Sequence, residues 1–145
     1  MTPPETVAVA GALLAGAVDA RTGFIPDAVT RTAALGAAVV AAASGDAAAA
    51  CAGAYAVAGV PIVLYLVTGG RGLGLGDVKL AVAIGTGLGA AHGVAALGAA
   101  FVLGGAAAAW LLVTRRARRG DALRFGPFLA AGTLVGAMLP SGAPA

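Results

Sequence analysis

The chain has 145 residues, of which 60% are hydrophobic and 10% are charged, and its net charge is +3. This composition excludes an ordinary soluble globular domain and is typical of an integral membrane protein. The single cysteine, Cys51, also excludes an internal disulfide framework or a cysteine-rich zinc site. We therefore expect one domain, residues 1–145, embedded in a lipid bilayer.

Apolar segments of membrane-spanning length recur along the chain and predict an all-α bundle of six transmembrane helices. The fourth and fifth are separated on length, because one helix over residues 77–114 would be about 57 Å long, too long for a bilayer. A turn is therefore required, and His92 and Gly93 are the best candidates for it. The six predicted spans are residues 4–20, 28–43, 47–68, 77–93, 94–114 and 125–140.

All nine basic residues fall in or beside the first, third and fifth predicted connections. Positively charged connections stay in the cytoplasm, so both termini are predicted to be extracytoplasmic. The arginine-rich run 115–119 is interpreted as a topology anchor beside anionic head groups and not as a nucleic-acid site. The basic residues are Arg21, Arg31, Arg71, Lys79, Arg115, Arg116, Arg118, Arg119 and Arg124.

Two acidic residues, Asp19 and Asp77, are predicted to lie at the cytoplasmic edge of the membrane, at the end of the first span and the start of the fourth. A carboxylate at that depth is costly, so a functional role is the default hypothesis. Two carboxylates brought close together share a proton near neutral pH, which is the chemistry of aspartic proteases. Three alternatives stay open: neutralisation by Arg21 or Lys79 without catalysis, a proton relay in a transporter or channel, and an inactive structural homologue.

Three motifs resemble those of the type IV prepilin peptidases and occur in the order of that family. In the first motif an aspartate precedes a hydrophobic-Pro-Asp turn. The second motif is Gly-x-Gly-Asp followed by x-Lys-Leu, and the third resembles Phe-Gly-Pro-Phe-Leu-Ala-x-Gly. Presenilin-like proteases share Gly-x-Gly-Asp but would carry a Tyr-Asp pair and a Pro-Ala-Leu motif, which this sequence lacks. The motifs here are DARTGFIPD at 19–27, GLGDVKL at 74–80 and RFGPFLAAG at 124–132.

The resemblance implies a multi-pass aspartic endopeptidase of the cytoplasmic membrane that removes the basic leader from prepilin-like precursors. It assigns catalysis to Asp19 and Asp77 and requires no metal or cofactor. Because the chain begins with the first span and has one cysteine, we expect the short, peptidase-only form without the zinc and methyltransferase domain. Asp27 is interpreted as a turn or helix-start residue, and residues 126–128 fit a helix-entry and packing role as well as a place at the mouth of the implied site. The implied active-site loop contains Gly74, Gly76 and Lys79, and the implied mouth contains Pro26, Asp27, Gly126 and Pro127.

Overall fold

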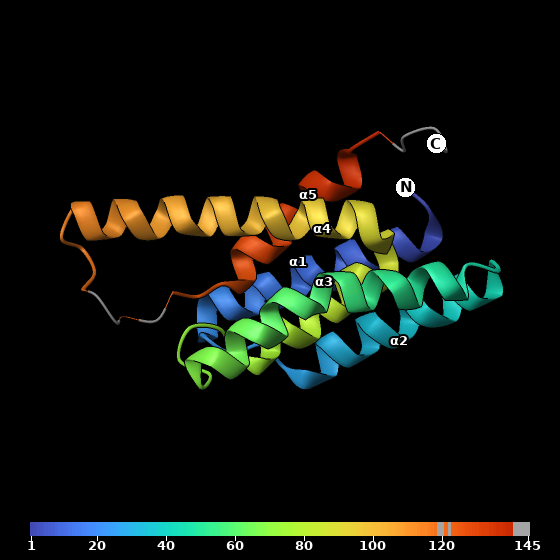
Figure 1. Ribbon diagram of the computed structural model, residues 1–145, viewed down its shortest axis with the longest axis horizontal. Coiled ribbons are helices and arrows are strands. Elements are labelled where there is room, and N and C mark those ends of the chain that lie inside the picture. Colours follow the sequence, from blue (N-terminus) through green and yellow to red (C-terminus); the bar gives the residue numbers. More distant parts are fainter. Residues whose placement is uncertain (119–120, 122, 141–145) are drawn as a thin grey trace.

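The computed structural model describes residues 1–118, 121 and 123–140, and all regular structure within them is helical (Figure 1). This confirms the predicted all-α class. Five helices are assigned in these residues, and their ends lie within two residues of the predicted outer bounds of the spans. They are α1 Pro3–Thr22, α2 Asp27–Ala43, α3 Ala47–Thr68, α4 Leu75–Val113 and α5 Gly126–Met138.

Helix α4 is not one continuous rod, because its backbone breaks at Gly89. Gly89 has φ 74° and ψ −179°, a conformation that essentially only glycine adopts. The chain folds back there: a Cβ built on Gly93 would lie 3.4 Å from the Cα of Gly85, whereas eight residues of straight helix span about 12 Å. Two helical segments, 75–88 and 90–113, therefore make up α4, and Figure 1 shows the second running back along the bundle.

The predicted turn at His92 and Gly93 is wrong in position, although the expected division of this segment is present at Gly89. Both residues lie inside the second helical segment. Gly93 has a packing role instead, since a Cβ there would lie 2.6 Å from Cγ2 of Val57 on α3. The missing side chain at Gly93 lets this segment approach α3, whereas the positive φ at Gly89 makes the turn itself.

Small residues let the helices approach closely where they cross, as is common in membrane bundles. A Cβ on Gly132 of α5 would overlap the α4 backbone at Ala96. A Cβ on Gly87 of α4 would likewise overlap Ala8 of α1. These approaches hold together α1, α4 and α5, the helices that carry the motifs. The largest fully buried side chains include Leu80, Ile84, Leu129 and Val57.

Two helices, α3 and α4, are long and apolar enough to cross a membrane, each with a mean hydropathy of 2.0 over its most apolar stretch. Within the described residues the other three do not meet this measure, and α5 is apolar but has only 13 residues. Large apolar side chains point outward from both long helices: Tyr55 is 82% exposed and Val113 is 83% exposed. An exterior of this kind suits lipid better than water. The structure thus provides two clear spanning candidates where the sequence predicts six spans.

The connections between helices alternate between the two ends of the bundle (Figure 1). The α1–α2 turn, the glycine-rich loop 69–74 and the described residues between α4 and α5 lie at one end, on the left of the figure. The N-terminus, the α2–α3 connection and the turn at Gly89 lie at the other end. The end of α1 and the starts of α4 and α5 therefore meet, which places Asp19 and Asp77 in the same region.

Candidate active site

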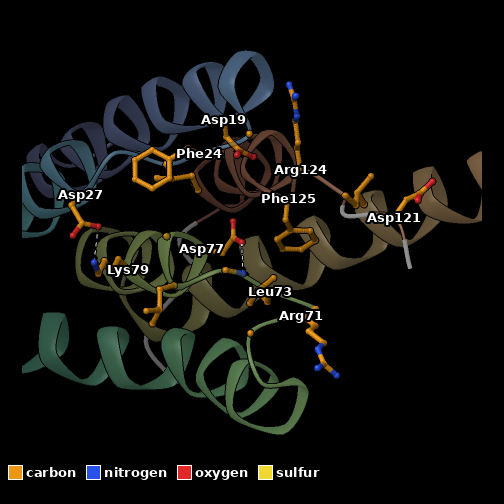
Figure 2. A pocket seen from close by; sticks show the side chains of 18 residues that line it. Asp19, Phe24, Asp27, Arg71, Leu73, Asp77, Lys79, Asp121, Arg124 and Phe125 are labelled. Atoms are coloured by element: carbon orange, nitrogen blue, oxygen red, sulfur yellow. Dashed lines mark hydrogen bonds and ion pairs between the residues drawn. The ribbon is translucent and has the colours of Figure 1, made fainter. Parts of the chain in front are cut away.

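A cavity of about 920 Å³ opens where these helix ends meet. Its walls come from the end of α1 with the turn that follows, the glycine-rich loop, the first turns of α4, and the segment before α5. Figure 2 shows the carboxylates of Asp19 and Asp77 directed into this space from opposite sides. The fold therefore brings together two acids that are far apart in the sequence.

Asp19 lies in the last turn of α1 and is buried, with only 5% of its surface exposed. The backbone N–H of Gly126, the first residue of α5, donates a hydrogen bond of 3.0 Å to its Oδ2. The first N–H groups of a helix have no partner inside the helix and carry the positive end of its dipole, so they bind anions well. The start of α5 thus compensates for a buried carboxylate on α1.

Position 126 accepts only glycine. A Cβ built on Gly126 would lie 2.7 Å from Oδ2 and 2.8 Å from Cβ of Asp19, closer than side chains pack. The same helix also approaches α1 at Gly16, where an added Cβ would lie 2.8 Å from the Cβ of Ala130. Gly126 therefore contacts Asp19 itself, and the neighbouring Phe125 is one of the residues that line the cavity.

Asp77 is held by its own loop. It lies in the first turn of α4, and the N–H of Gly74 donates a hydrogen bond of 3.0 Å to its Oδ2. The residue is only 9% exposed, and its Oδ1 is buried without a hydrogen-bond partner among the described residues. A buried oxygen without a partner is uncommon in folded proteins and is one of the signs of a catalytic group.

The second glycine of the Gly-x-Gly-Asp motif makes room for the α1–α2 turn. A Cβ on Gly76 would lie 2.9 Å from the Cβ of Ile25, a buried residue of that turn. The space at Gly74 is larger, since the nearest atom to an added Cβ is Oδ2 of Asp77 at 3.4 Å. Gly76 therefore permits a close approach, whereas Gly74 contributes its N–H.

Lys79 pairs with Asp27 and not with either buried acid. Its Nζ lies 2.6 Å from Oδ1 of Asp27, the first residue of α2, and Arg31 lies 3.5 Å from Oδ2. The hydrogen bond from Lys79 lowers the pKa of Asp27, whose carboxyl precedes the apolar part of α2. Within the described part of the chain, no ion pair joins either buried acid to a basic side chain. Neutralisation by a neighbouring cation, one of the open alternatives, is therefore not observed.

Of the four predicted mouth residues, Asp27 lines the cavity, whereas Pro26, Gly126 and Pro127 do not. Pro26 is the N-cap of α2 and Pro127 lies in the first turn of α5. Arg124 and Phe125 line the cavity, although the sequence patterns do not mark them as site residues. Their position directly before Gly126 in the third motif is the available signal. Among the described residues there is no group of three potential metal ligands.

The fold and the site define a helical protein with an apolar exterior and paired buried acids at one end. A family model described as the type IV leader peptidase family matches residues 6–109, a segment that includes both acids. The match covers well over half of the chain, and this protein therefore belongs to the type IV leader peptidase family. This confirms the family indicated by the motifs. No curated protein and no solved structure matches the sequence.

Proposed function

We propose that this protein is an aspartic endopeptidase of the cytoplasmic membrane that removes the basic leader from prepilin-like precursors. One observation carries the proposal: in a chain of the leader peptidase family, the carboxylates of Asp19 and Asp77 are buried and face one cavity. Paired buried carboxylates share a proton near neutral pH, so one acid is available as a base and the other as an acid.

The proposed reaction needs only water, the two acids and the substrate. The ionised carboxylate removes a proton from water, whose oxygen attacks the scissile carbonyl carbon, and the protonated carboxyl donates its proton to the carbonyl oxygen. When the tetrahedral intermediate collapses, the C–N bond breaks, the leaving nitrogen takes up the proton that came from water, and a hydroxyl of the intermediate returns a proton to the donor carboxylate, which restores the starting pair. We assign the proton-donating role to Asp77, because its Oδ1 has no partner among the described residues.

The charge distribution supports a cytoplasmic location for this site. The connections that carry the basic residues lie at the same end of the bundle as the cavity (Figure 1). Basic connections favour the cytoplasmic side, so we infer that the cavity opens there and that both termini are extracytoplasmic. We propose six membrane crossings, with the two segments of α4 as separate spans.

The cavity wall also suits a substrate with an apolar segment beside its cleavage site. Phe24 and Leu75 both line the cavity and are 65% and 51% exposed. Exposed apolar side chains at a binding site gain free energy when a partner covers them. We infer that they contact the apolar helix that follows the leader in prepilin-like proteins.

Cleavage of a candidate prepilin from the same genome tests this proposal. The precursor is co-expressed with the wild type, Asp19→Asn or Asp77→Asn, and its processing is followed as a mobility shift. We expect the wild type to shorten the precursor, and each substitution to abolish this while the protein remains in the membrane. Asp46→Asn, which changes an exposed acid before α3, is the matched control and retains cleavage.

Cleavage that persists in either of the two asparagine variants at the buried positions excludes the two-aspartate mechanism. If the wild type leaves several prepilins intact, the buried acids belong to another function, and proton transport across vesicles becomes the measurement to make.

A further inference from the structure

We propose that Arg124 is a positioning residue for Asp19: it fixes the start of α5 against the last turn of α1 and so holds the Gly126 N–H on the carboxylate. This inference rests on the proposed function, because it assigns Arg124 a part in the cleavage reaction. It concerns a side chain that touches neither the buried acids nor, in our proposal, the substrate.

The contact itself lies beside the catalytic pair. Nη1 of Arg124 donates a hydrogen bond to the carbonyl oxygen of Ala20, the residue that follows Asp19. The guanidinium also lies over the end of α1, since a Cβ on Gly23 would be 3.4 Å from Nε of Arg124. Figure 2 shows the arginine side chain extending beside the end of this helix, away from the cavity centre.

This contact suits the end of α1 chemically. The last carbonyl groups of a helix have no partner inside the helix and carry the negative end of its dipole. A guanidinium is always charged and donates several hydrogen bonds from a rigid plane. Arg124 therefore satisfies an exposed carbonyl and compensates for the helix end in which Asp19 is located.

The segment before α5 needs such an anchor. The N-cap residue of α5, Phe125, makes no side-chain capping hydrogen bond, and residues 123–125 have no regular secondary structure. Two hydrogen bonds, from Arg124 to Ala20 and from Gly126 to Asp19, join this segment to adjacent residues of α1. If the first bond is lost, the segment is free to shift, and the second bond lengthens with it.

A substrate-binding role is the competing explanation, because Arg124 lines the cavity and is exposed. The two roles differ in what they change. A residue that binds substrate raises KM when it is removed, whereas one that orients a catalytic carboxylate lowers kcat and leaves KM nearly unchanged.

The test compares Arg124→Gln and Arg124→Lys with the wild type, using purified protein in detergent and a prepilin substrate. We expect Arg124→Gln to lower kcat about 10- to 100-fold with little change in KM, since small misplacements of a catalytic group cost rates of this order. Arg124→Lys retains a charged donor for the Ala20 carbonyl and is expected to recover much of the rate. Arg116→Gln is the matched control: it removes the same charge from the same connection, where Arg116 stacks on Trp110, and it retains the wild-type rate.

Hydrogen exchange at the Gly126 amide, measured by NMR in micelles, gives a second readout that does not depend on cleavage. We expect faster exchange in Arg124→Gln and near-normal exchange in Arg124→Lys. A raised KM with unchanged kcat, or an unchanged Gly126 amide, overturns the positioning role even when the enzyme is active. If the wild type does not cleave, the proposed function fails, and the amide exchange alone still decides whether Arg124 holds the contact.

Discussion

The two buried aspartates receive similar hydrogen bonds from very different distances along the chain. Asp77 accepts its backbone N–H from Gly74, three residues earlier in the same loop, whereas Asp19 accepts its N–H from Gly126, 107 residues later. The first bond forms together with the first turn of α4. The second requires α1 and α5 to pack in register. The environment of Asp19 therefore depends on tertiary structure, and that of Asp77 depends mainly on its own motif.

This difference makes Asp19 the more vulnerable of the two acids to changes elsewhere in the molecule. Its partner belongs to α5, which the described residues 123–125 precede without regular secondary structure. Substitutions that separate α5 from α1 should therefore reduce activity before they unfold the bundle, and substitutions near Asp77 should act through local crowding.

The largest effect expected outside the acids themselves is that of Gly126→Ala. The new Cβ would meet the Asp19 side chain at 2.7 Å, so either α5 moves away or the carboxylate rotates. Both outcomes remove the N–H contact, and we expect the initial rate of prepilin cleavage to fall on the order of 100-fold.

A glycine with free space around it provides the control for this variant. Gly105→Ala lies on α4, where an added Cβ has no atom within 4 Å, and it should retain the wild-type rate. If Gly105→Ala loses as much activity as Gly126→Ala, the loss reflects a general effect of alanine substitution and not the contact with Asp19.

Gly76→Ala tests the local side of the comparison and should have an intermediate effect. The added Cβ would lie 2.9 Å from the Cβ of Ile25, which cannot rotate away because it is attached directly to the backbone. Overpacking of this kind typically destabilises by about 1–3 kcal/mol. Thermal unfolding in detergent should therefore occur at a lower temperature than in the wild type, with a partial loss of cleavage rate.

Removing the opposing side chain should relieve this crowding. We expect Ile25→Gly, which removes the Cβ that the new methyl group meets, to restore part of the activity that Gly76→Ala loses, so that the two substitutions are not additive. Fully additive losses would show that the crowding at Gly76 comes from another part of the structure.

Much of the fold is predictable from the sequence, because apolar segments bounded by charges and glycines are local signals. The predicted span 47–68 coincides with α3, Ala47–Thr68. The turn within α4 is different: several glycines in this segment offer the conformational freedom, and only packing decides which one uses it. Gly93 lies in the helix and packs against Val57, whereas Gly89 adopts the positive φ of the turn.

The candidate site likewise combines contacts within one motif, which the sequence indicates, with contacts between helices, which it does not. The bond between Gly74 and Asp77 lies within one motif, so the sequence indicates a role for that loop. Nothing local indicates that Gly126 would contact Asp19 or that Arg124 would contact Ala20, because these contacts depend on how α5 docks on α1. The motif at 124–132 can be recognised in the sequence, but the sequence does not show that it contacts the end of α1.

The smallest effect is expected for Asp27→Asn, which removes the charge that Lys79 contacts from the α2 side of the site. The side chains of Asp27 and Lys79 are 47% and 37% exposed, and pairs this exposed contribute little to stability. Lys79 lowers the pKa of Asp27 below its ordinary value of 3.8, so the charged pair contributes fully above that value and is lost as the pH falls through the lowered pKa. We therefore expect the wild type to unfold at a slightly higher temperature than Asp27→Asn near neutral pH, and the difference to disappear well below about pH 4.

Asp46→Asn separates the ion pair from the simple loss of an acid. Asp46 is exposed at the opposite end of the bundle and makes no side-chain capping hydrogen bond to α3, so this variant should unfold like the wild type at every pH. A difference for Asp27→Asn that persists at low pH would show that the amide disturbs the start of α2 by its shape. A difference that follows the titration of Asp27 shows instead that the ion pair with Lys79 joins α2 to α4 two residues after Asp77.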